Sequence, residues 1–157
     1  MTNLALRTLT TEAELAALAP QWDALVTAAP RPSPFMLHAW LLVWWRHFGE
    51  GSSLEVHAAF RDGRLVGALP LFTRRERGLR ITAFVGGGAS ALGDVLVAPG
   101  ADVDAVARGL ASRAATVKHD LVDVFGLPAE SRLAEAAGEG LRLLERVEAP
   151  VLDLGPG

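Results

Sequence analysis

Few residues of this chain have the types and spacing that metal binding or nucleophilic catalysis requires. The sequence contains no cysteine, which excludes disulfides, thiolate nucleophiles and cysteine-based zinc or iron–sulfur sites. No Gly-x-Ser-x-Gly elbow marks a serine nucleophile. The histidines show neither an HxH nor an HExxH spacing: they are His38, His47, His57 and His119. We therefore predict no metal site and no catalytic residue in this chain.

The remaining candidates for ligand binding lie in a glycine-rich stretch and on a strand. Gly86-x-Gly88-x-x-Ala91 superficially fits a dinucleotide fingerprint, but that motif must open a helix, and here it leads into another predicted strand. Within this stretch, Ser90 and Asp94 could contact a substrate or could only form turn hydrogen bonds. His57, on a predicted strand, is the third substrate-binding candidate.

The largest aromatic cluster lies between residues 33 and 49. At helical spacing, Trp40, Trp44 and Phe48 fall on one side, with Trp45 beside them. Ser33-Pro34 is typical of a helix start and Gly49 of a helix end. The stripe could be a stacking platform for a sugar or a base. Core packing is the favoured interpretation, because apolar residues on one helix face are the usual pattern of a buried helix.

Length and composition limit the class of protein. A chain of 157 residues predicts one domain with a real core. A net charge of −3 gives no bulk positive charge for nucleic acid or anionic lipid. No signal peptide is visible, and the longest apolar run, residues 39–45, is far shorter than the roughly 20 residues of a membrane span. We expect a cytoplasmic protein that binds no nucleic acid and has no membrane span.

Hydrophobic periodicity predicts an α/β layered fold. The clearest signal is a hairpin over residues 54–72 with a type I′ turn at Asp62-Gly63, pairing Phe60 with Leu65 and Leu54 with Leu71. Both of its faces are apolar, which favours helices on both sides of the sheet. The other expected strands cover residues 4–9, 81–85, 95–97, 121–125, 141–147 and 151–154, and the other helices 11–18, 20–26, 102–118 and 130–137.

Residues 73–80 carry four arginines around one glutamate, which could form an anion-binding patch. The favoured interpretation is a solvated hairpin tip, because charge runs beside a glycine are usually exposed.

Several stretches resemble the CelD-type (cellulose-biosynthesis) acetyltransferase family, which has the GNAT (acyl-CoA N-acyltransferase) fold. The similar stretches span most of residues 15–154 and comprise residues 21–25, 33–35, 40–49, 62–71, 84–88 and 94–100. The resemblance implies an α/β (α+β) fold with a mixed, mostly antiparallel central sheet and helices on both faces.

Members of that family resemble two GNAT-like halves in tandem, as in the related Fem-type aminoacyl transferases, with the acyl-CoA site in the second half. The resemblance therefore implies that residues 1–157 are a single GNAT-like domain, the N-terminal half of a longer enzyme. Its implied partners are a C-terminal GNAT-like half and a small-molecule, sugar or amine acceptor.

The superfamily's cofactor loop has the pattern Gln/Arg-x-x-Gly-x-Gly/Ala between a strand and a helix. Aligned on Gly100, this chain has Val97 at the Gln/Arg position and Asp102 at the last Gly/Ala position. A carboxylate there competes with pyrophosphate for the helix amides. We expect no cofactor in this half and a non-catalytic role in acceptor binding and packing. The alternative is a non-catalytic carbohydrate- or partner-binding module.

Overall fold

The computed structural model describes residues 4–87, 93–142 and 144. Its strands are β1 (Ala5–Leu9), β2 (Ser53–Arg61), β3 (Arg64–Glu76), β4 (Leu79–Phe84), β5 (Leu96–Val97) and β6 (Leu121–Asp123). Its helices are α1 (Glu12–Ala16), α2 (Ala19–Ala28), α3 (His38–Phe48), α4 (Val103–Ala115) and α5 (Arg132–Ala137), with 3-10 turns at Pro34–Met36 and Gly138–Gly140.

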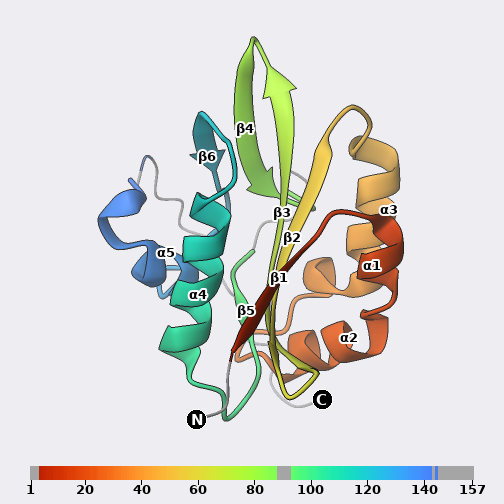
Figure 1. Cartoon of the computed structure of the whole chain (residues 1–157), viewed down its shortest axis with the longest axis vertical. Helices are drawn as coiled ribbons and strands as arrows, with labels where there is room; N and C mark the ends of the chain where they lie inside the picture. The colour runs from red at the N-terminus through yellow and green to blue at the C-terminus, as the bar shows by residue number, and fades with distance from the viewer. Residues whose placement is uncertain (1–3, 88–92, 143, 145–157) are drawn as a thin grey trace, which may run out of the picture.

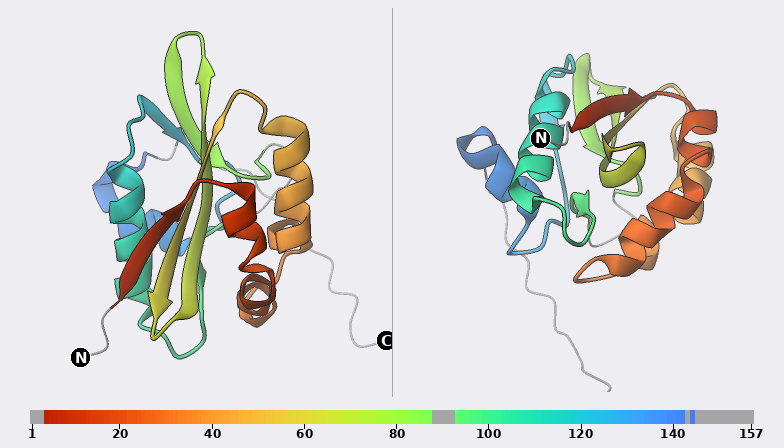
Figure 2. Two further views of the ribbon diagram at one scale, coloured as in Figure 1. Left: turned by 45° about the vertical axis from the view of Figure 1, so that its right-hand side comes forward. Right: turned by 60° about the horizontal axis from the view of Figure 1, so that its bottom comes forward.

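The described strands form one mixed sheet in the order β1-β2-β3-β4-β6, with β5 paired to β3. All pairs are antiparallel except β4 and β6, which run parallel because α4 crosses over before β6. Helices α1, α2 and α3 lie on one side of the sheet, and α4 and α5 on the other (Figures 1 and 2). The predicted mostly antiparallel sheet with helices on both faces is confirmed.

Each face of the sheet has its own hydrophobic core. On the α1–α3 side, Trp22, Leu41 and Trp44 pack against Val56 and Phe72. On the α4–α5 side, the core comprises Ala59, Leu69, Leu71, Phe84, Val95, Val106, Ala107, Leu110 and Leu133. The alternation of β2 and β3 supplies both cores, because successive side chains point to opposite faces.

The hairpin turn is as predicted, but most of the predicted register is wrong. Asp62 and Gly63 both have positive φ, as a type I′ turn requires, and Phe60 pairs with Leu65. Beyond that pair a bulge shifts the register, so that Ala59 faces Gly67 and Leu54 faces Phe72 rather than Leu71. The extra residue moves the following β3 side chains to the opposite face.

The aromatic helix begins later than Ser33 and buries only part of its stripe. Ser33 precedes the 3-10 turn, and the first amide of α3 donates instead to the Asp23 carboxylate at 2.8 Å. Trp44 is buried against Phe72, with ring centroids 5.1 Å apart. Phe48 was predicted to be core but is 64% exposed, because it is the last residue of the helix.

Gly49 ends α3 for a reason other than the predicted one. Its φ is −84°, outside the left-handed region that a glycine end-cap typically uses. A Cβ at this position would lie 2.5 Å from Cε3 of Trp45, so the close approach of the Trp45 ring requires glycine.

The remaining elements match their predicted places with shifted ends. Thr11 and Glu14 form the predicted capping box, and Pro20 lies in the first turn of α2. The strand predicted for residues 121–125 ends at Asp123. Residues 141 and 142 are not in a strand, contrary to prediction, and the rest of the two C-terminal strand predictions lies outside the described residues, apart from Leu144, which is also not in a strand.

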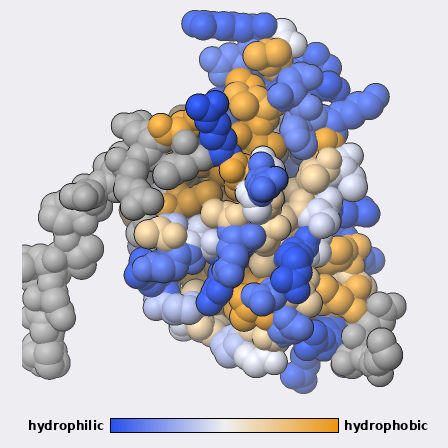
Figure 3. All heavy atoms as spheres, turned by 90° about the vertical axis from the view of Figure 1, so that its left-hand side faces the viewer, coloured by the Kyte–Doolittle hydropathy of each residue, from blue (hydrophilic) through white to orange (hydrophobic). Residues whose placement is uncertain are grey.

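The arginines of residues 73–80 lie on a projecting, hydrophilic β3–β4 hairpin (Figures 1 and 3). Arg77 and Gly78 form its turn with positive φ. Arg80 pairs with Asp120 at 3.0 Å, and Arg74 pairs with Glu76 at 3.3 Å. The solvated hairpin tip is the interpretation that this arrangement supports.

Candidate functional site

The turn between β5 and α4 is where a GNAT-type cofactor loop is expected. β4 and β5 pair with successive stretches of β3, at residues 71–76 and 67–68. They therefore lie one after the other along the same edge of β3. The chain then turns at Gly100, with φ of +75°, and enters α4. The structure therefore has the order of elements that the alignment on Gly100 assumed: a strand, a glycine turn and a helix.

The side chain of Asp102 occupies the start of α4. Its Oδ1 accepts a hydrogen bond from the Ala105 amide at 2.9 Å, and its carbonyl accepts from the Val106 amide. Asp104 adds a second carboxylate in the same first turn. A helix N-terminus favours an anion through its free amides and its dipole, and here the chain supplies that anion itself. The Asp102 carboxylate thus occupies a helix amide, as the sequence analysis expects.

A shallow groove, which we call the α2 groove, opens beside this turn on the side of α2. Its volume is about 570 Å³. It lies at the end of the sheet where α2, the β2–β3 turn and the β5–α4 turn come together (Figure 2, right). The lining residues are Gln21, Ala24, Leu25, Ala28, Gly63, Arg64, Leu65, Ala98 and Pro99. The sequence did not predict this groove, because its three segments are far apart in the chain and none of them carries a recognisable binding motif.

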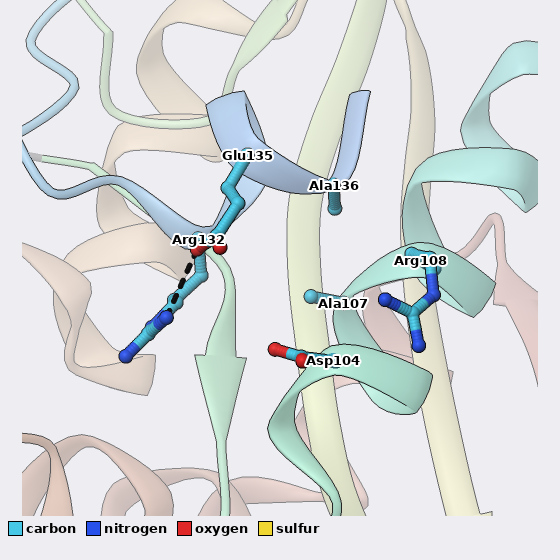
Figure 4. Close-up of a pocket in the computed structure, with 6 residues that line it drawn as sticks. All are labelled: Asp104, Ala107, Arg108, Arg132, Glu135 and Ala136. Carbon is cyan, nitrogen blue, oxygen red and sulfur yellow. Dashed lines mark hydrogen bonds and ion pairs between the residues drawn. The ribbon is translucent and has the colours of Figure 1, made fainter. Parts of the chain in front are cut away.

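A second hollow between α4 and α5 is too small for a substrate. It encloses about 30 Å³ and is lined by Asp104, Ala107, Arg108, Arg132, Glu135 and Ala136. Arg132 already pairs with Glu135 at 2.9 Å (Figure 4). A space of this size holds about one water molecule.

His57 is buried in the sheet beneath α4, with 1% of its surface exposed. Its Nδ1 lies 3.1 Å from the Thr8 hydroxyl, which also accepts a hydrogen bond from Arg113 Nε at 3.0 Å. Either neutral tautomer fits this contact, because the hydroxyl keeps both its proton and a second lone pair after it accepts from Arg113. The other ring nitrogen, Nε2, is buried and has no hydrogen-bond partner among the described residues. Burial and, secondarily, the Arg113 charge lower the pKa of His57 from 6.5 to about 4.

Asp94 ties α5 to the strand that precedes α4. Its carboxylate accepts hydrogen bonds from the amides of Val95, Arg132 and Leu133 and from the Ser131 hydroxyl, at 2.8 to 3.1 Å. Ser131 in turn caps α5 through the Ala134 amide. Only the Val95 bond is local, so Asp94 mainly joins two distant segments rather than forming a turn, and its oxygens are engaged within the protein.

Two of the three predicted substrate-binding residues, His57 and Asp94, lie in the described part of the chain and do not contact each other through hydrogen bonds or ion pairs. The third, Ser90, lies outside the described residues. Within residues 4–87, 93–142 and 144, no group of histidine and carboxylate side chains is placed to hold a metal ion. The described helices also include none that is long and apolar enough to cross a membrane.

Comparisons with known proteins identify the fold. No family model matches the sequence, and no curated protein matches it. Among solved structures, an acetyltransferase of Trypanosoma brucei has 20% identity and a TM-score of 0.52, over 96% of this chain and 100% of that chain. An aminoglycoside acetyltransferase from an uncultured soil metagenomic sample has 17% identity and a TM-score of 0.54, over 98% and 99%.

A ribosomal-protein-alanine N-acetyltransferase from Brucella melitensis biovar Abortus 2308 has 16% identity and a TM-score of 0.51, over 96% of this chain and 99% of that chain. At these identities the likeness extends to the fold and not to the substrate. The antiparallel β1–β4 sheet, the parallel β6 and the flanking helices are the fold of GNAT-type acetyltransferases.

Proposed function

We propose that this chain is a non-catalytic GNAT-like domain of a CelD-type N-acyltransferase. It contributes acceptor binding and packing, and a C-terminal GNAT-like half supplies the acyl-CoA site. The stretches that resemble the CelD-type family and the GNAT-type fold support the superfamily assignment. The acceptor is a small molecule, a sugar or an amine.

The observation that carries the non-catalytic role is the position of Asp102. Its carboxylate is bound to the Ala105 amide, one of the groups that a pyrophosphate would require. Asp104 lies in the same turn and repels a second anion. Pro99 removes a further backbone donor from the loop.

The arginine-rich hairpin does not compensate for these carboxylates at the helix start. The arginine-rich β3–β4 tip projects from the end of the sheet opposite to the β5–α4 turn (Figure 1). Arg80 is moreover held by Asp120. Arg64 shares the α2 groove with Pro99, but it approaches from the β2–β3 turn rather than from α4.

Calorimetric titration with acetyl-CoA tests this proposal. We expect no detectable heat from the wild-type chain, and a gain of weak binding in Asp102→Gly, which frees the Ala105 amide. Asp62→Gly is the matched control, because it removes the same charge from the exposed β2–β3 turn and should gain nothing. Micromolar binding by the wild-type chain would overturn the proposal. No gain in Asp102→Gly would contradict the explanation by Asp102.

A carbohydrate- or partner-binding module is the second candidate, and the outer side of α3 supports it. Val43 is 52% exposed and Phe48 64% exposed, and Trp40 and Trp45 are only partly buried. Tryptophan fluorescence separates the two functions. In a partner-binding module, a sugar or protein ligand should shift the emission of Trp40 and Trp45 and reduce its quenching by acrylamide, whereas the acyltransferase domain should show no such change with simple sugars.

A further inference from the structure

We propose that the α2 groove binds an amphipathic monoanion, a ligand with an apolar body and a single carboxylate. This site goes beyond the proposed acyltransferase role and does not depend on it. The groove lies between α2, the β2–β3 turn and residues 98–99, and its volume of about 570 Å³ falls within the usual range of small-molecule sites, roughly 300–1,000 Å³.

The polar side chains that line the groove are hydrogen-bond donors. Gln21 Oε1 accepts a hydrogen bond from the Leu65 amide at 2.9 Å, which fixes its side chain and leaves its NH2 group as a donor. Arg64 has no ion-pair partner among the described residues. No carboxylate is among the lining residues. Two donors without an acceptor select a ligand that brings an anionic acceptor group.

The charge of the groove limits the ligand to one negative charge. Arg64 is the one cationic residue in the lining, and Asp62 lies two positions before it in the adjoining turn. A guanidinium pairs with a carboxylate through two parallel hydrogen bonds. A doubly charged phosphate would retain one unpaired charge near Asp62, so a carboxylate fits better.

The rest of the lining is apolar and small. Leu25 and Leu65 are buried and form part of the core beneath the groove. Ala24, Ala28 and Pro99 have short side chains, which do not fill the groove. An aliphatic or aromatic body laid on this surface removes apolar area from water. The combination of an apolar floor and donors at one end is that of a site for a fatty-acid-like or hydrophobic amino-acid-like carboxylate.

Titration of the ¹⁵N-labelled full chain with sodium octanoate, followed by NMR, tests the site. We expect amide shifts to concentrate at residues 21–28, 63–65 and 98, and 1-octanol to bind more weakly because it lacks the carboxylate. Arg64→Met should weaken octanoate binding about fivefold, because an exposed charge-assisted pair contributes only a modest binding free energy. The same variant should leave octanol binding unchanged. Ala28→Trp should abolish binding of both by filling the groove.

Arg75→Met is the matched control, because it removes an exposed arginine from the β3–β4 hairpin and should leave octanoate binding unchanged. All three variants change exposed positions, and their amide spectra report directly whether each is folded. Equal affinity for octanoate and octanol, an Arg64→Met variant that binds like wild type, shifts centred elsewhere, or no binding at millimolar octanoate would each overturn the proposal.

Discussion

Acidification should destabilise this protein through His57 before it does so through its carboxylates. The pKa of His57 is about 4 in the folded protein, against 6.5 for an ordinary histidine, because burial and then Arg113 disfavour the charged ring. The unfolded chain therefore takes up a proton at a pH where the folded protein does not. The stabilisation is complete above about pH 6.5 and is lost as the pH falls from there to about 4.

The size of the effect follows from the two pKa values. A fall from 6.5 to about 4 corresponds to roughly 3 kcal/mol, at about 1.4 kcal/mol per pKa unit. The ring is buried, so solvent screens this effect little. The loss is a substantial part of the roughly 5–15 kcal/mol by which a domain is stable. Asp120, whose pKa is lowered to about 2 by Arg80, loses its contribution only below its ordinary value of 3.8.

Urea unfolding at a series of pH values between about 7.5 and 4.5 measures this contribution. The wild-type free energy of unfolding should decline through the window with a slope approaching 1.4 kcal/mol per pH unit, roughly the value for one proton. His57→Gln keeps a hydrogen-bonding group for the Thr8 hydroxyl but does not titrate, so its decline should be flatter. His47→Gln, at an exposed position of α3, is the control and should retain the wild-type slope. Equal slopes for wild type and His57→Gln would refute the reasoning.

Four substitutions test the packing and the attachment of α5. Trp44→Ala should cost roughly 3–5 kcal/mol of unfolding free energy and Phe48→Ala less than about 1, because only the first ring is buried; similar costs in urea unfolding would contradict the division of α3 into buried and exposed faces. Asp94→Ala should cost about 2 kcal/mol and reduce the hydrogen-exchange protection of α5, whose first amides lose their acceptor; unchanged protection would disprove the tether. Gly67→Ala should cost roughly 1–3 kcal/mol of unfolding free energy and so lower the melting temperature, because its Cβ would overlap the buried Val106 side chain. An unchanged melting temperature would show that α4 can move away.

The sequence predicted the elements of the fold well, and the β2–β3 hairpin shows where such prediction stops. The Asp62-Gly63 turn follows from local residue preferences, and it is present. The bulge between Ala59 and Phe60 does not, because Val66 and its neighbours on the opposite strand are apolar in either register. When a strand is hydrophobic on both faces, its sequence does not indicate which face each residue occupies, and so does not fix the register.

The candidate site was less predictable, because its contacts join distant segments. Asp102 could be identified, since a helix cap bonds to an amide three residues away. Asp94 could not, because its partners at residues 131–133 lie almost forty positions later, although Ser131 is itself a typical cap. The α2 groove similarly depends on Gln21, Arg64 and Pro99, whose proximity exists only after folding.

The pairing of β1 with β2 sets an order for the folding of the sheet. The β2–β3 and β3–β4 hairpins join neighbours in the sequence, whereas β1 pairs Ala5 with Phe60, and β6 reaches β4 only after α4 has crossed over. Closing a longer loop costs more chain entropy before any contact compensates for it. The central meander can therefore assemble in a nascent chain before either outer strand has a place to dock. Its two outer positions are completed last, and substitutions in β1 or β6 should accelerate unfolding more than they slow folding.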